Sequence, residues 1–266
     1  MQKIKALSNA IKILTTSIII SSTAIAYKGH PNNRIQKPWS VGIAGMFSPN
    51  IYKDTEDSYL LLPFISYTGD RFALYGPNAI FKLNNQKYYD ISANAYLYSE
   101  NFKPSDSSDS NLQKLNERKY SMMAGIKLLF KINRSNKINL GIYRSFFGAE
   151  NGLLVKSTYS FNKMINLKNS IIRISPAIGV EYQNAQLTNY YYGISNSESS
   201  ISLLPEYNLK SAISPYISFN IMYTLNHQWT IALSSTAKMT PNTIYDSPMV
   251  NKRVSISGNA FIAYLF

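Results

Sequence analysis

Apolar and polar side chains alternate along several long segments of the chain. In Arg253–Phe266, every second position holds an apolar residue or glycine, and the first positions between them are Arg253, Ser255, Ser257 and Asn259. Successive side chains of a β-strand point to opposite faces, so this segment has one apolar and one largely polar face. The same period recurs in segments 89–97, 120–131, 172–182, 213–223 and 228–239. The pattern predicts β-strands.

Three features favour a transmembrane antiparallel β-barrel over a soluble β-sandwich. The segments exceed the roughly 5 to 6 residues of soluble strands and reach the roughly 9 to 11 that cross a bilayer. Aromatic residues gather at strand ends, where we expect an interfacial girdle of Tyr223, Trp229 and Tyr264. The polar faces also carry charges that a dry core would reject but a watery lumen accepts. The expected lumen charges are Lys127, Lys156, Arg173, Glu181, Lys238 and Arg253.

The number of strands is set by the region 69–86. Eleven candidate strands are recognised along the chain, whereas single-chain bacterial barrels have even numbers. Gly76-Pro77 divides region 69–86 into two short strands, which gives twelve. A ten-stranded barrel is the alternative if an early segment lies outside the wall. If the C-terminus is periplasmic, the connections 100–117, 183–210 and 241–251 all face outward from the cell, as long loops do in such barrels.

The N-terminus has the features of a secretory signal peptide. Lys3, Lys5 and Lys12 make it basic, an apolar run extends to Ile25, and Ala24-Ile25-Ala26 is a small-x-small site. We therefore expect a signal peptide over residues 1–26, a flexible arm over 27–36 and an outer-membrane barrel over 37–266. A membrane anchor is the alternative, but the apolar run is shorter than the roughly 20 residues that a spanning helix needs. Cysteine is absent, so disulfides cannot stabilise the exported protein.

The chain is strongly basic, with a net charge of +13. Basic proteins often bind nucleic acid, but here the lysines and arginines are scattered singly, without a basic helix. An exported protein is also separated from nucleic acid. The expected partners are therefore anionic groups of the outer membrane, including lipid headgroups and lipopolysaccharide.

Candidate catalytic and metal-binding residues are few. The two histidines are His30, in the expected arm, and His227, in a short turn next to Trp229. Neither has a serine and an acid in an evident triad arrangement, and no histidine pair has metal-ligand spacing. Acidic groups near residues 54–57 and 106–109 are typical of solvated loops. The sequence predicts a protein that is not an enzyme, with no cofactor and no metal.

The end of the chain has the form of an assembly signal. Ile262, Tyr264 and Phe266 share the apolar face of the last segment. Any lipid-facing strand needs this alternation, but facing lipid does not require an aromatic residue at the end of the chain. Phe266 therefore indicates recognition by the barrel-assembly machinery.

Several motifs resemble those of the MltA-interacting protein/OmpV family of outer-membrane proteins. They extend over most of the chain after the expected signal peptide, and their order is what makes them specific. The matching segments are Pro63-Phe64-Ile65-Ser66-Tyr67, Tyr190-Tyr191-Tyr192-Gly193-Ile194-Ser195, Leu204-Pro205-Glu206-Tyr207, Trp229, Asp246-Ser247-Pro248-Met249-Val250 and Tyr264-Leu265-Phe266. Two segments depart from the family pattern: Ser211-Ala212-Ile213, and the Ser/Asp tract after Ser99.

The resemblance implies a function. The namesake of the family is regarded as a scaffold that joins a murein lytic transglycosylase to a murein-synthesising penicillin-binding protein, and other relatives are described as adhesins or as osmoregulated or resistance-linked porin-like proteins. We therefore expect a non-enzymatic scaffold linked to peptidoglycan synthesis and remodelling. Two alternatives remain: a porin-like small-solute channel that favours anions, and a surface adhesin acting through loops 100–117 and 183–210.

Overall fold

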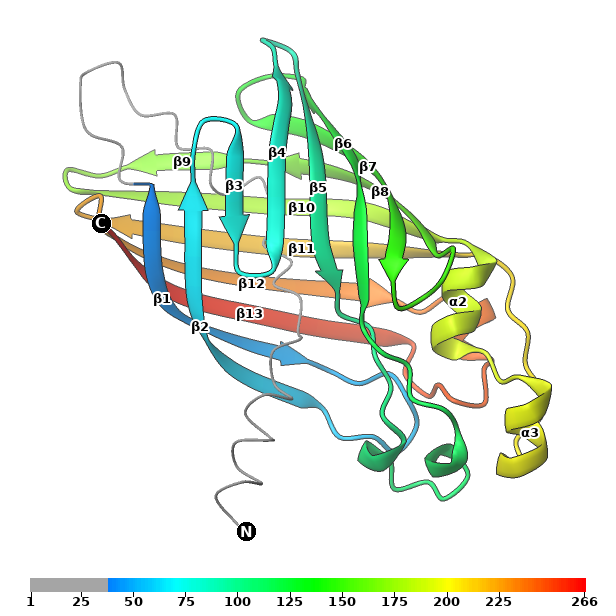
Figure 1. Cartoon of the computed structure of the whole chain (residues 1–266). Helices are drawn as coiled ribbons and strands as arrows, with labels where there is room; N and C mark the ends of the chain where they lie inside the picture. The colour runs from blue at the N-terminus through cyan, green and yellow to red at the C-terminus, as the bar shows by residue number, and fades with distance from the viewer. Residues whose placement is uncertain (1–37) are drawn as a thin grey trace.

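A computed structural model describes residues 38–266, and these form a closed antiparallel β-barrel (Figure 1). The expected signal peptide, residues 1–26, and the arm, residues 27–36, lie outside the described residues. The strands are β1 (Trp39–Ser48), β2 (Ser58–Thr68), β3 (Phe72–Tyr75), β4 (Asn78–Asn85), β5 (Tyr89–Tyr98), β6 (Ser121–Lys131), β7 (Asn136–Phe147), β8 (Leu153–Phe161), β9 (Lys163–Asn166), β10 (Ser170–Gln183), β11 (Ala212–Leu225), β12 (Trp229–Met239) and β13 (Val254–Leu265).

These thirteen strands make a twelve-stranded barrel. β8 and β9 both pair with β10, and only Asn162 separates them, so they form one interrupted barrel strand. The two short strands predicted in region 69–86 are β3 and β4, which confirms the count of twelve. β13 pairs with β1, and β10 with β11, so the sheet closes on itself. Closure pairs the strand edges that a lipid environment could not hydrate.

The alternation seen in the sequence becomes an outward and an inward face. On β11, Ile217 and Phe219 are exposed on the outer wall, whereas Ser214 on the inner wall is buried. On β6, Ile126 and Phe130 are exposed outward. Lys127 therefore points inward, because adjacent strand residues face opposite sides.

The two ends of the barrel differ in their connections. Turns 69–71, 86–88, 132–135, 167–169 and 226–228 form the short-turn end, which also holds the end of β13. Asn226 and His227 both have positive φ, at 50° and 56°, as a tight hairpin turn requires. The connections 49–57, 99–120, 184–211 and 240–253 form the long-loop end. The β3–β4 turn also points this way, but it stops early because β3 pairs only with Ser66–Thr68 of β2.

Five short helices belong to the long loops. They are η1 (Pro104–Asp106), η2 (Leu112–Lys114), α2 (Ala185–Tyr192), α3 (Asn196–Ser202) and α4 (Asn242–Tyr245). The Asn184 side chain caps α2 by accepting a hydrogen bond from the Leu187 N–H. Ser195 and Glu198 form a capping box at the start of α3, so local sequence fixes where both helices begin. None of the helices in residues 38–266 is long and apolar enough to cross a membrane.

Candidate functional site

An ionic network crosses the inside of the barrel near the long-loop end. Lys156 Nζ of β8 lies 2.8 Å from Glu181 Oε2 of β10. Lys238 Nζ of β12 lies 2.7 Å from Glu100 Oε1, just beyond β5, and 3.7 Å from Glu181 Oε1. Two cations and two carboxylates therefore alternate across the lumen. Pairing of this kind offsets the cost of burying these charges.

Neutral side chains complete the network. The Tyr98 hydroxyl donates to Glu181 Oε1 over 3.1 Å, and Gln183 Nε2 donates to the Tyr98 hydroxyl. Lys156 also lies over the ring of Tyr96, with 6.0 Å from Nζ to the ring centroid. Glu181 therefore accepts both ionic and neutral hydrogen bonds, which offsets the cost of burying its carboxylate.

The six expected lumen charges fall into three groups. Lys156, Glu181 and Lys238 meet in the network above. Lys127 and Arg173 lie on inward positions of β6 and β10, nearer the short-turn end. Arg253 precedes β13 at the rim, exposed, with its guanidinium 3.7 Å from the ring centroid of Tyr245.

A packed apolar plug closes the long-loop end. α2 inserts Tyr191 and Tyr192, which are almost fully buried, against Tyr52 and Phe102 from two other loops. The Tyr52 hydroxyl donates to the Tyr191 carbonyl over 3.1 Å. The Ser121 and Tyr191 hydroxyls are hydrogen-bonded at 2.7 Å, which ties the plug to the barrel wall. Burial raises the pKa of the Tyr191 hydroxyl, so it stays neutral.

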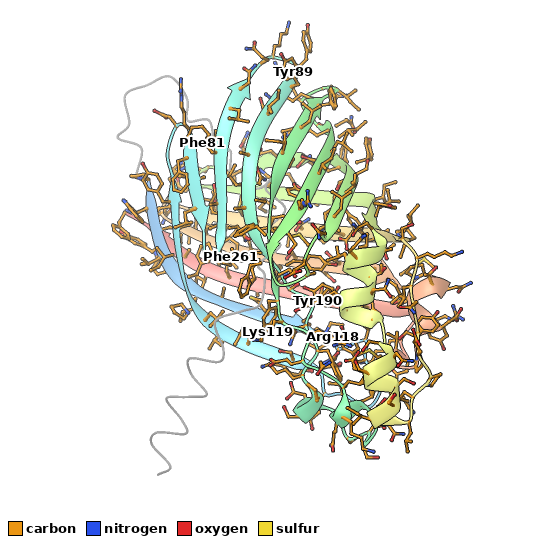
Figure 2. The ribbon with its side chains drawn as sticks, turned by 45° about the vertical axis from the view of Figure 1, so that its right-hand side comes forward. Phe81, Tyr89, Arg118, Lys119, Tyr190 and Phe261 are labelled. Carbon is orange, nitrogen blue, oxygen red and sulfur yellow. The ribbon has the colours of Figure 1, made fainter. Side chains whose placement is uncertain are left out.

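A buried ion pair fixes α3 to the loop after η2. Arg118 Nη2 lies 2.7 Å from Glu198 Oε1, with both side chains less than a tenth exposed. Arg118 also donates to the Gly193 carbonyl over 3.0 Å, and Figure 2 shows it beside α2. Burial opposes ionisation of Glu198, but hydrogen bonds from the backbone N–H groups of Ser195 and Asn116, together with the Arg118 charge, leave its pKa below the usual value.

Charge is distributed unevenly between the two halves of the barrel. Within the described residues, the short-turn half has ten lysines and arginines but only two acids, Asp70 and Asp90. The long-loop half has eleven basic and twelve acidic residues. The short-turn half comprises residues 38–43, 65–94, 127–141, 160–176, 219–233 and 260–266. Its excess positive charge favours anions.

The expected aromatic and C-terminal residues lie on the outer wall at the short-turn end. Trp229 and Tyr264 are in ring contact, with centroids 5.1 Å apart. Tyr223 lies on the neighbouring strand β11 and faces Ile231 of β12 in the register. Ile262 is exposed on β13, and Phe266 is exposed just after the end of that strand.

Two aromatic residues of the girdle and one acidic residue of the ionic network were not predicted from the sequence. Trp39 contacts Tyr67 with ring centroids 4.9 Å apart and extends the aromatic row along the short-turn end. Trp39 and Tyr67 lie at the ends of strands β1 and β2, and this position was the signal that could have revealed them. Glu100 gave no such signal, because it lies beyond β5 in a loop.

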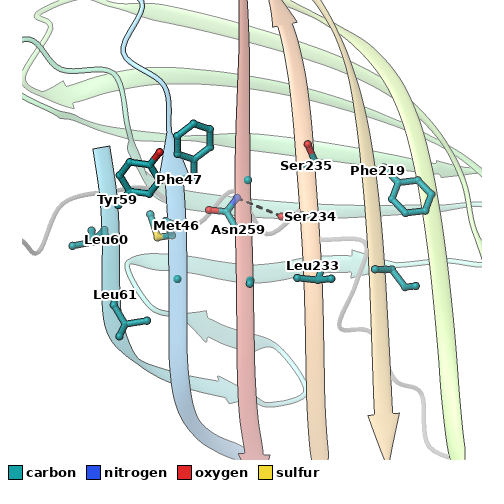
Figure 3. A pocket seen from close by; sticks show the side chains of 14 residues that line it. Met46, Phe47, Tyr59, Leu60, Leu61, Phe219, Leu233, Ser234, Ser235 and Asn259 are labelled. Carbon is teal, nitrogen blue, oxygen red and sulfur yellow. Dashed lines mark hydrogen bonds between the residues drawn. The ribbon is translucent and has the colours of Figure 1, made fainter. Parts of the chain in front are cut away.

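A shallow groove of about 730 Å³ runs along the outer wall across β2, β1, β13, β12 and β11 (Figure 3). Gly45, Gly258 and Ala260 form its floor, and Tyr59 and Phe219 flank it. The groove lies on the face that a surrounding membrane would cover. Among residues 38–266, no three acidic, histidine or cysteine side chains gather in a way that could hold a metal ion.

Comparisons with known proteins agree with the fold. The sequence model of a family described as MltA-interacting protein MipA matches residues 41–266. The outer-membrane protein YiaT of Escherichia coli (strain K12) is 27% identical over 227 residues, covering 85% of this chain and 90% of that protein. The MltA-interacting protein of the same strain is 26% identical over 242 residues, with 91% and 93% covered. Outer membrane protein OmpV of Vibrio cholerae is 20% identical over 265 residues, with 96% and 99% covered.

Proposed function

The chain belongs to the family of MltA-interacting protein MipA and is an outer-membrane β-barrel, and from this premise we propose that it is a non-enzymatic scaffold for murein-remodelling enzymes. The name of the Escherichia coli relative, MltA-interacting protein, supports this role. The partner class is a murein lytic transglycosylase, with a penicillin-binding protein as the second partner. Both would meet the barrel at its periplasmic, short-turn end.

The closed outer end carries the proposal. A pore needs a continuous aqueous path, whereas Tyr191, Tyr192 and Phe102 bury their rings in the plug across the long-loop end. The Ser121–Tyr191 hydrogen bond ties the plug to the wall, and the Arg118–Glu198 ion pair joins two of its loops. A barrel closed in this way is better suited to holding a partner than to passing solutes.

A direct binding assay tests the scaffold. A purified murein lytic transglycosylase is immobilised and exposed to the purified barrel in neutral detergent. We expect saturable binding that weakens when Arg71 and Lys168, in two periplasmic turns, are changed to alanine. The matched control is Lys114→Ala in the outer loops, which should leave binding unchanged. Absence of saturable binding to the wild type would reject the proposal.

A small-solute pore is the second candidate, favoured by the inward cations Lys127 and Arg173. Planar-bilayer recordings separate the two. For the scaffold, the purified protein should show no steady channels. Steady anion-selective channels whose selectivity falls in Arg173→Ala would instead establish the pore.

A further inference from the structure

Four basic side chains gather on the inner wall in the periplasmic half of the barrel. Lys127 and Lys131 belong to β6, Lys137 to β7 and Arg173 to β10. The residues next to them in sequence, such as Phe130 and Ile138, are exposed on the outer wall. The basic side chains therefore face the lumen. We refer to Lys127, Lys131, Lys137 and Arg173 as the basic cup.

Lys137 has two like charges of the basic cup within electrostatic reach, Lys131 and Arg173. Lys131 and Lys137 are direct cross-strand partners in the β6–β7 register. Both Arg173 and Lys131 act electrostatically on Lys137. Like charges placed directly opposite each other destabilise a strand pair. The arrangement therefore costs stability unless negative charge comes to it from elsewhere.

The protein supplies little of that negative charge. Asp90 of β5 pairs with Lys131, and it acts electrostatically on Lys127 and on Lys137. Among the described residues, Asp90 is the sole acidic residue of the strands in this half. The basic cup therefore keeps a net positive charge of three after Asp90 is counted.

Solvent reaches the basic cup from one side. The side chains of Lys131 and Asp90 are 25% and 28% exposed, so an ion from the periplasm can approach them. The plug closes the opposite end of the lumen. Headgroups of the surrounding bilayer face the outer wall, where they meet turn residues such as Arg134 instead.

Ammonium and guanidinium groups bind carboxylates and phosphates through charge-assisted hydrogen bonds. A multivalent anion can neutralise several cations at once and so relieve their mutual repulsion. We infer that the basic cup binds a small multivalent anion of the periplasm that carries carboxylate or phosphate groups. This inference is independent of the scaffold proposal, because it concerns the lumen and needs no partner protein.

Calorimetric titration of the purified barrel in neutral detergent at low ionic strength tests the inference. Citrate is the carboxylate probe, pyrophosphate the phosphate probe, and glucose the uncharged control. We expect saturable binding of citrate or pyrophosphate at one site and none of glucose. Comparing the affinities for citrate and pyrophosphate shows whether the site prefers carboxylate or phosphate groups. No saturable binding of either anion would overturn the inference.

Variants locate the site. Lys137→Ala and Arg173→Ala should each weaken binding about tenfold, as expected for the loss of one charged hydrogen-bond partner. Lys137→Arg keeps the charge and should bind the anion with an affinity within about threefold of that of the wild type. The matched control is Arg134→Ala, because Arg134 is exposed in the β6–β7 turn. An equal loss in Arg134→Ala would show diffuse attraction to the basic end and overturn the inference.

Stability provides a second readout that does not depend on measuring heat. Without an anion, Lys137→Ala should raise the urea midpoint of unfolding, because it removes a repelling charge. Citrate should raise the midpoint of the wild type and leave that of Lys137→Ala nearly unchanged. A destabilised Lys137→Ala, or equal stabilisation of both proteins by citrate, would contradict the basic cup as a binding site.

Discussion

Lys156 of β8 and Glu181 of β10 are direct partners in the strand register, and their side chains form a 2.8 Å ion pair inside the barrel. Lys238 approaches the same carboxylate from β12. Glu181 therefore joins β8, β10 and β12 through its two ion pairs. Glu181 is 5% exposed and Lys156 21%, so the pair is only partly screened by water.

The first prediction concerns this pair. Glu181→Gln should destabilise the barrel by about 2–3 kcal/mol, because it leaves the Lys156 and Lys238 charges without their shared carboxylate. Adding Lys156→Met should recover part of the loss, since one uncompensated charge is removed. Urea unfolding in lipid vesicles measures both. Equal stability of Glu181→Gln and the wild type would show that the ion pair does not stabilise the barrel.

The second prediction concerns the plug. Replacing residues 185–209 with a short Gly-Ser linker removes Tyr191 and Tyr192 and should open the lumen to the outside. We expect this variant to conduct in planar bilayers, whereas the wild type does not. Loss of surface adhesion in the same variant would not by itself identify an adhesin, because the segment is also part of the plug. A non-conducting variant that still folds would mean that another element closes the barrel.

Strand alternation made much of this architecture predictable. The period of two placed Lys156, Glu181 and Lys238 on polar faces, and closure of the barrel then brought three different strands together. Glu100 could not be predicted as their partner, because its position depends on how the loop after β5 packs under the plug. The plug itself depends on contacts between residues far apart in sequence, such as Tyr52 with Tyr191, and alternation carries no information about these.

Arg253 marks the point where the alternating pattern in the sequence stops predicting the direction of a side chain. The apolar and polar pattern continues through Arg253, but β13 begins at Val254. Before β13 begins, the side chains no longer alternate between the two faces of the barrel wall. The Arg253 side chain instead stacks over Tyr245 and donates to the Asn242 side chain over 2.8 Å. Its place at the rim follows from where strand pairing ends.

The third prediction concerns the pH dependence of the plug. The pKa of Glu198 in the folded protein is below its usual value. The ionised carboxylate therefore stabilises the fold at pH values above the unfolded pKa of about 4.3, and this contribution is lost as pH falls through the folded pKa. Hydrogen exchange in segment 185–203, corrected for intrinsic rates, should accelerate between pH 5 and pH 3 in the wild type.

Glu198→Gln tests the assignment of that effect. The variant should exchange faster at pH 7 and lose most of the additional acceleration at low pH, because the titrating group is gone. Glu206→Gln, an exposed change in the same loop, is the control and should follow the wild type. If both variants keep the wild-type pH profile, another group governs the plug.

The last prediction concerns the end of the chain. Phe266 has a half-exposed ring on the outer wall, while its backbone N–H donates to the Trp39 carbonyl over 3.1 Å. Phe266→Ala keeps this backbone bond and removes only the ring, so spontaneous folding into vesicles should change little. Assembly in cells should fall several-fold if the assembly machinery reads the terminal aromatic. Quantifying folded protein in isolated outer membranes measures this, with Phe219→Ala, another outward aromatic residue, as the control. Equal losses for both variants in cells would assign the effect to general loss of lipid-facing surface, and Phe266 would then have no special role in assembly.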